Sequence, residues 1–211
     1  MSLARLRQSL SRFRRTDRGA ASLEFVFVFL PLILLIFLIV QIAIAYHWML
    51  SAQKGLEMAA RLAAVTPPVH RGLTVNTGLG TRVVPRQAAT GADTGEACYL
   101  GACEQMQIFT CWGGEFMPNA DGVLPATDCD FSRFQRIYDE VDRFAYSLEM
   151  EDFAIAYEDV GLGYSGQSYV PLIVLAVRPQ AMPMILRVFD SSIQFQIPEL
   201  LATIVAEDLG N

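Results

Sequence analysis

Four cysteines offer the clearest chemistry in this chain of 211 residues. They are Cys98, Cys103, Cys111 and Cys129. A zinc site usually contains a close Cys-x-x-Cys pair or a histidine among its ligands, and this spacing contains neither. We therefore predict two disulfides that brace the surrounding Gly- and Pro-rich stretch, provided that it lies in an oxidising compartment. Four cysteines permit three pairings, and the sequence does not choose among them.

A glycine motif follows the cysteines in the chain. It has the form G-x-G-x-x-G and consists of Gly161, Gly163 and Gly166. This pattern holds a dinucleotide pyrophosphate when a strand precedes it and a helix follows it. Here the apolar, β-branched stretch "SYVPLIVLAVRP" follows and predicts a strand. We therefore expect a hairpin loop in which the glycines adopt positive φ.

The other candidate catalytic residues do not form a set. Ser165 lies beside the glycine motif but lacks the glycine spacing of a nucleophile elbow. His47 and His70 belong to no motif that would make either a general base. Because no nucleophile, base and orienting group can be assembled, and no metal or cofactor motif occurs, we expect neither an enzyme nor a cofactor-binding protein.

A single carboxylate, Glu24, stands before a run from Phe25 to Gln53 that contains no Asp, Glu, Lys or Arg. The run is longer than the roughly 20 residues that cross a bilayer as a helix. We therefore predict a membrane-spanning segment. An ionised carboxylate at the edge of hydrocarbon is costly unless it has a partner, so Glu24 calls for a nearby cation.

The distribution of charge predicts an orientation in the membrane. Six arginines precede Phe25, opposed only by Asp17 and Glu24. The positive-inside rule then places the N-terminus in the cytoplasm and the C-terminal part on the other side of the membrane. Since the whole chain has 16 Lys and Arg and 22 Asp and Glu residues, the part from Phe25 onward carries ten more acidic than basic side chains. This excess argues against binding to nucleic acid.

Residue patterns divide the chain into four regions. We predict a basic cytoplasmic leader at 1–19, a transmembrane helix with its extracytoplasmic extension at 20–64, a cysteine-containing loop region at 65–130 and a head at 131–211. Strong helix formers continue beyond the apolar run, and "TPP" from Thr66 to Pro68 ends the helix. Breaker residues dominate the loop region.

The head combines helix and strand patterns. Apolar side chains recur at helical spacing at Phe134, Ile137, Val141, Phe144 and Leu148. The stretches "DFAIAYEDV" and "SYVPLIVLAVRP" predict a β-hairpin, and "LATIVA" predicts a further strand. The predicted fold class is α+β, with a long N-terminal helix and a small head in which one helix packs on a short antiparallel sheet.

The stretch "RRTDRGAASLEFVFVFLPLILLIFLIVQIAIAYHWML" resembles the start of TadE-like pseudopilins, the minor pilins of the Flp/Tad (tight adherence) type IVb pilus system. These proteins share a short basic leader, Arg-Gly-Ala-Ala-x-x-Glu-Phe, a hydrophobic helix and an alanine-rich extension. The resemblance covers about Arg14 to Ala64. It implies a pilin-like fold and cleavage by prepilin peptidase after Gly19, which makes Ala20 the new N-terminus and Glu24 the fifth residue of the mature chain.

Cleavage after Gly19 would create the cation that Glu24 lacks. The free α-amino group of Ala20 would be positively charged and would lie about one helical turn from Glu24. Within one subunit, or between neighbouring helices in a bundle, this pair could set the registry of packing. The alternative is that Glu24 lies in the headgroup layer beside Arg18.

Three functions are consistent with these residues. The first is a structural minor pilin in the inner membrane or pilus, whose implied partners are prepilin peptidase, the major Flp pilin, other pseudopilins, the inner-membrane assembly platform and membrane lipid. The second is a soluble binding domain secreted after cleavage at Ala45, since Ala43 and Ala45 form an A-x-A arrangement and Arg14 and Arg15 a twin arginine. The third is an unprocessed, membrane-anchored scaffold.

Overall fold

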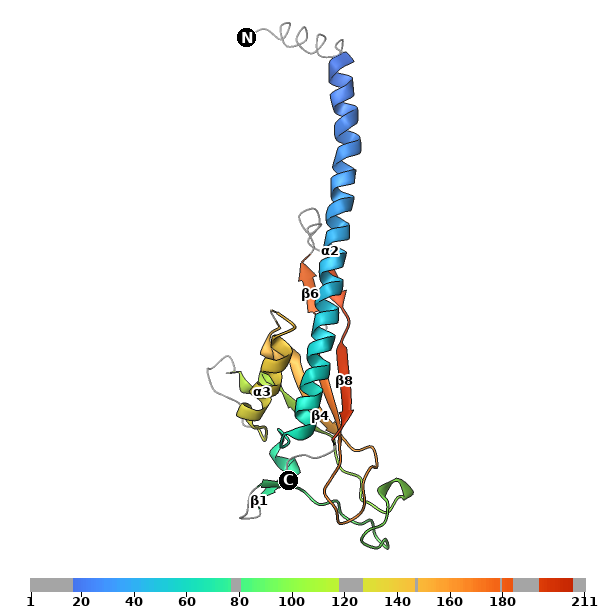
Figure 1. Cartoon of the computed structure of the whole chain (residues 1–211), viewed down its shortest axis with the longest axis vertical. Coiled ribbons are helices and arrows are strands. Elements are labelled where there is room, and N and C mark those ends of the chain that lie inside the picture. Colours follow the sequence, from blue (N-terminus) through green and yellow to red (C-terminus); the bar gives the residue numbers. More distant parts are fainter. Residues whose placement is uncertain are drawn as a thin grey trace, which may run out of the picture. The chain divides into compact units, whose positions relative to one another are not determined.

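The computed structural model describes residues 17–76, 81–117, 127–146, 148–178, 180–183 and 194–206 (Figure 1). The chain divides into two compact units, and the first comprises Met1–Ala45 and Pro183–Gln194. The second unit, called the head below, comprises Tyr46–Met182 and Phe195–Asn211. Residues 1–16 of the basic leader predicted at 1–19 lie outside the described residues.

One long helix, α2 (Asp17–Val65), forms the N-terminal part of the structure. It extends the helix predicted at 20–64 by three residues at its start and one at its end, and Pro31 lies inside it. Large apolar side chains are exposed on all sides of α2 from Leu23 to Leu32, and most remain exposed as far as Ile44. A helix that is apolar around its whole circumference suits lipid rather than water. Among the described residues, α2 is the only helix that is long and apolar enough to span a membrane.

The C-terminal part of α2 belongs to the head and buries a single stripe. Its buried side chains recur at steps of three and four residues, at Trp48, Ala52, Leu56, Ala59 and Ala63. Most of these are alanines, so the helix axis can approach its neighbours closely. The indole Nε1 of Trp48 donates a hydrogen bond to the carbonyl oxygen of Tyr146 at 3.0 Å.

The centre of the head is a four-stranded antiparallel sheet in the order β3-β4-β5-β8. Its strands are β3 (Phe109–Trp112), β4 (Phe153–Glu158), β5 (Leu172–Val177) and β8 (Leu200–Val205). β4, β5 and β8 confirm the predicted hairpin and the further strand at "LATIVA". Two smaller sheets pair β1 (Thr74–Asn76) with β2 (Thr81–Val83) and β6 (Gln180–Pro183) with β7 (Gln194–Ile197).

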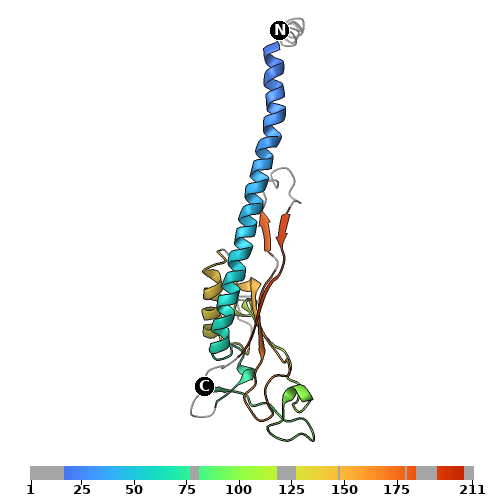
Figure 2. The same cartoon turned by 45° about the vertical axis from the view of Figure 1, so that its right-hand side comes forward.

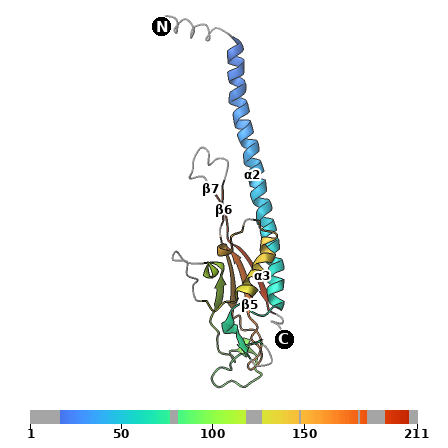
Figure 3. The ribbon, with the colours of Figure 1, turned by 90° about the vertical axis from the view of Figure 1, so that its left-hand side faces the viewer.

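The sheet buries one face. The register aligns Ile155 of β4 with Cys111 of β3 and Leu175 of β5, and all three are fully buried. The C-terminal part of α2 and helix α3 (Phe131–Asp142) lie on the same side of the sheet (Figures 2 and 3). The alternation of buried and less buried residues in β4 and β5 follows from this one-sided cover.

Helix α3 is shorter than its sequence pattern predicted. It begins after Asp130, whose carboxylate accepts a hydrogen bond from the N–H of Arg133 at 3.1 Å, and it ends at Asp142. Phe134, Ile137 and Val141 are buried as expected, but Phe144 and Leu148 lie beyond the helix, and Phe144 is 37% exposed. The chain leaves the helix here and presents the carbonyl of Tyr146 to Trp48.

The region predicted as loop, 65–130, contributes regular structure to the head. It supplies β1, β2 and β3, and three short 3₁₀ helices, η1 (Arg71–Leu73), η2 (Cys98–Leu100) and η3 (Gly113–Phe116). A fourth, η4 (Met150–Asp152), leads into β4. The hydroxyl of Tyr157 in β4 accepts a hydrogen bond from the N–H of Val69 at 2.9 Å, and burial raises the pKa of Tyr157 to about 12. This region is therefore an integral part of the head and contacts its central sheet.

Candidate functional site

The predicted processing residues lie in the first turns of α2. Gly19 and Ala20 are within the helix, and Glu24 follows about one turn later with an exposed side chain. The side chain of Arg18, the alternative partner of Glu24, lies outside what the structure describes. An exposed carboxylate at this end of an apolar helix is accessible to a cation on a neighbouring helix.

The apolar surface after Glu24 is continuous. Phe25, Val26, Phe27 and Val28 are consecutive, and each exposes more than half of its side chain. An amphipathic helix of a soluble protein would not show this pattern, because such a helix buries one face. This part of α2 is a candidate membrane anchor.

Both predicted disulfides form in the head. Cys98 pairs with Cys103 and Cys111 pairs with Cys129. In chain order, the first cysteine thus bonds to the second and the third to the fourth. The first bond closes the short loop that contains η2. The second joins β3 to the residue that precedes Asp130, the N-cap of α3. The prediction of two disulfides is confirmed, and the structure selects one of the three pairings.

Two loops of the head are joined by a buried ion pair. Arg86 donates from Nη1 and Nη2 to the two carboxylate oxygens of Asp159, at 2.7 Å in each case. Asp159 also accepts hydrogen bonds from the N–H groups of Met106 and Gly161. Burial alone would raise the pKa of Asp159, but these hydrogen bonds outweigh it and hold the pKa below its ordinary value. Sequence reasoning missed this pair, because no local pattern links the two residues.

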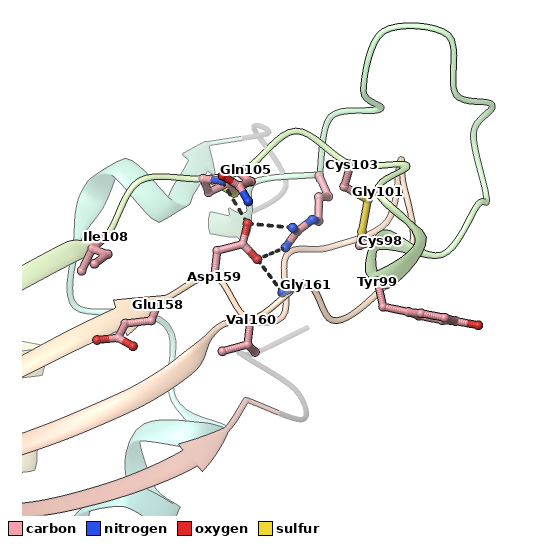
Figure 4. A pocket seen from close by; sticks show the side chains of 12 residues that line it. Cys98, Tyr99, Gly101, Cys103, Gln105, Ile108, Glu158, Asp159, Val160 and Gly161 are labelled. Atoms are coloured by element: carbon pink, nitrogen blue, oxygen red, sulfur yellow. Dashed lines mark hydrogen bonds and ion pairs between the residues drawn. A yellow bond between two sulfur atoms is a disulfide. The ribbon is translucent and has the colours of Figure 1, made fainter.

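A hollow of about 840 Å³ lies over this ion pair (Figure 4). In the figure, Ile108 and Glu158 lie to the left of the Asp159 carboxylate, Val160 lies below it and Tyr99 lies to the right. The Cys98–Cys103 disulfide forms part of the wall. The hollow therefore combines exposed apolar side chains with carboxylates.

The glycine motif shapes one of these loops. Gly161, Gly163 and Gly166 have φ of 73°, 93° and 80°, as expected for a hairpin loop. Ser165 is buried between them, where its Oγ accepts from the N–H of Gly95 at 2.9 Å and donates to the carbonyl of Asp93 at 2.6 Å. Ser165 thus holds the two loops together.

The histidines remain separate from these groups. His70 accepts a hydrogen bond at Nδ1 from the N–H of Gly72, and His47 is exposed on α2. Within the described ranges, no three His, Cys, Asp or Glu side chains group in a way that could hold a metal ion. The features that distinguish this molecule are therefore its helix and its braced loops.

A segment of the apolar helix matches a known protein family. Residues 19–61 match the family model described as TadE-like protein. This TadE-like segment begins at Gly19 and lies entirely within α2. The match confirms that this segment resembles TadE-like proteins, as the sequence indicated. No curated protein matches the chain, and no solved structure does.

Proposed function

We propose that this chain is a structural minor pilin, or pseudopilin, of a Tad (Flp) type IVb pilus used for adhesion. The observation that carries the proposal is the TadE-like segment at residues 19–61, which starts at the predicted cleavage junction. Its helix exposes apolar side chains from Leu23 onward and then enters the core of the head at Trp48. One helix thus provides both a membrane anchor and a structural element of the head.

In this proposal prepilin peptidase cleaves after Gly19. The new α-amino group of Ala20 then pairs with Glu24, either in the same helix or in a neighbouring subunit. A charge pair in a medium of low dielectric constant is sensitive to position, so it fixes the registry between adjacent apolar helices. The exposed position of Glu24 on α2 supports this role.

The proposed orientation places the leader in the cytoplasm and the head outside it. The arginines before Phe25 support this orientation through the positive-inside rule. Two disulfides in the head support it as well, because disulfides persist in oxidising compartments. The proposed partners are prepilin peptidase, the major Flp pilin, other pseudopilins and the inner-membrane assembly platform.

A secreted head is the second candidate function. The boundary of the two units within α2, between Ala45 and Tyr46, favours it, because cleavage after Ala45 would leave the head with its buried α2 stripe from Trp48 onward. Against it, α2 continues as a regular helix through this bond. An uncleaved scaffold would retain the same fold with its leader intact.

Mass spectrometry of the natural protein, purified from cells with active prepilin peptidase, separates these functions. The minor-pilin proposal expects a chain that begins at Ala20. A chain that begins at Tyr46 would establish the secreted head instead, and a chain with its complete leader would establish the scaffold.

A matched pair of variants then tests the role of Glu24. Glu24→Gln should be cleaved but should enter fibres poorly, because it removes the carboxylate and keeps the size of the side chain. Asp17→Asn makes the same change within the leader, which is absent from the mature chain, and should leave fibre yield unchanged. Equal fibre yield from Glu24→Gln and wild type would contradict the registry role.

A further inference from the structure

The two loops around the hollow have an unusual distribution of polar and apolar groups. Polar contacts hold the loops together from inside, through Arg86, Asp159 and Ser165. The Cys98–Cys103 disulfide is buried as well. Large apolar side chains point outward instead, with Tyr99 75% exposed, Leu100 73% and Ile108 63%. Tyr99 and Ile108 both line the hollow, and exposed apolar side chains that gather beside polar groups suit a binding surface.

The loops are also rigid, which favours binding. Backbone hydrogen bonds join Arg86 to Gln167, Cys98 to Gly163 and Ala89 to Ala102. With the disulfide and the ion pair, these bonds hold Tyr99 and Ile108 in place before any partner arrives. A surface that is already ordered loses little conformational entropy on association.

Three charged residues line the hollow, Arg86, Asp159 and Glu158, and because the first two pair with each other, Glu158 supplies its one uncompensated charge among the described residues. The two loops as a whole are acidic. Residues 85–108 and 158–170 contain five acids and one base: Asp93, Glu96, Glu104, Glu158 and Asp159, and Arg86. Arg86 is engaged by Asp159, and its Nε has almost no exposed surface. Arg86 is therefore not available to an anion. The side chain of Glu158 lines the hollow and makes no hydrogen bond or ion pair within the described part of the chain.

This charge pattern selects among occupants. An anionic lipid surface would be repelled by the acids. A second copy of the chain would present the same acids, so it would be repelled if it docked face to face. A basic protein segment with apolar side chains would instead be complementary in both charge and polarity.

We propose that the hollow between the loops at residues 85–108 and 158–170 binds a basic, partly apolar segment of another protein. A lysine or arginine of the segment pairs with Glu158, and its apolar side chains pack on Tyr99, Ile108 and Val160. This surface lies in the head and does not depend on cleavage after Gly19.

Site-specific photo-crosslinking of the full chain in its native cells tests this proposal. A photoreactive phenylalanine analogue replaces Tyr99 in one variant and Tyr146 in the control, since Tyr146 is also an exposed aromatic residue but lies outside the loops. The proposal expects a discrete protein adduct from position 99 and none of the same mass from position 146. Mass spectrometry of the adduct should locate the crosslink in a segment with net positive charge.

A second pair of variants tests the charge. In the chain that carries the photoreactive residue at position 99, Glu158→Gln should lower the adduct yield about threefold, as expected for the loss of one partly exposed ion pair. Asp139→Asn, which removes an exposed acid on α3, should leave the yield unchanged.

Three results would overturn the proposal: no adduct from position 99, an adduct with lipid, glycan or an acidic segment, or a yield that Glu158→Gln does not change. Because the readout requires neither fibre assembly nor leader removal, it remains interpretable if the minor-pilin proposal fails.

Discussion

Arg86 and Asp159 lie 73 positions apart in the sequence and meet through two parallel hydrogen bonds of 2.7 Å. Their side chains are only 2% and 7% exposed. Arg86 also lies over the ring of Tyr169, with 5.4 Å between the guanidinium carbon and the ring centroid. The pair therefore connects the loop before η2 with the loop between β4 and β5.

Breaking this pair from one side should destabilise the head strongly. Asp159→Asn leaves the buried guanidinium without its counter-charge, and we expect the free energy of unfolding to fall by about 3–5 kcal/mol. Urea unfolding of the full chain in detergent micelles, followed by tryptophan fluorescence, measures this change. Trp48 is buried in the head and reports its unfolding.

Replacing both partners separates the charge from the packing. The double variant Arg86→Met/Asp159→Leu should be closer in stability to wild type than Asp159→Asn, because no unpaired charge remains buried. A double variant that is less stable than the single one would show that the pair stabilises the head by more than charge compensation.

The same pair should make stability depend on pH. The hydrogen bonds hold the pKa of Asp159 below its ordinary value of 3.8, although burial alone would raise it. A carboxylate whose pKa is lowered by folding contributes its stability above the unfolded pKa, about 3.9, and loses it as the pH falls through the folded value. The stability difference between wild type and Asp159→Asn should thus be constant from pH 7 to pH 5 and shrink below about pH 4. A difference that grew on acidification would contradict this assignment.

Gly55 should resist substitution although it lies within a helix. A Cβ added there would come within 3.0 Å of both the Cβ of Phe144 and the carbonyl oxygen of Val141. Replacing glycine in a helix normally gains up to about 1 kcal/mol, but overpacking costs about 1–3 kcal/mol, so the crowding should win for a large side chain. We expect Gly55→Leu to lower the free energy of unfolding.

Gln53, two positions before Gly55 on α2, provides the control. Gln53 is exposed on the same helix, and Gln53→Leu should change stability by less than about 0.5 kcal/mol. Equal effects of the two leucine variants in urea unfolding would show that Gly55 is not a packing position.

The two disulfides should contribute unequally to stability. Cys111 and Cys129 are 18 positions apart, and Cys98 and Cys103 are 5 apart. A longer closed loop restricts the unfolded chain more. Removing the Cys111–Cys129 bond with a double alanine variant should therefore cost about 3 kcal/mol, and removing the Cys98–Cys103 bond about 2 kcal/mol. Urea unfolding of both double variants measures this order.

Thiol labelling tests the compartment of the head. If the head lies outside the cytoplasm, all four cysteines should resist alkylation in the denatured chain until a reductant is added. Four reactive thiols in protein taken directly from cells would place the head in the cytoplasm and would contradict the proposed orientation.

Local patterns predicted much of this fold. The charge-free run predicted α2, the alternating and β-branched stretches predicted β4, β5 and β8, and the glycines predicted the loop with positive φ at Gly161, Gly163 and Gly166. These features depend on residues close together in the chain, which is why the sequence reveals them. The resemblance of the N-terminal segment to TadE-like proteins was equally local, and the match at residues 19–61 confirms it.

Contacts between distant residues were decided only by the tertiary structure. It selected the pairing of the cysteines, ended α3 at Asp142 where the following turn meets Trp48, and brought β3 from a predicted loop region to the edge of the sheet. It also buried Arg86 against Asp159 and placed Gly55 against Phe144. The physical reason is that burial and hydrogen bonding depend on which surfaces meet when the chain packs, and residues far apart in the sequence carry no local sign of that meeting.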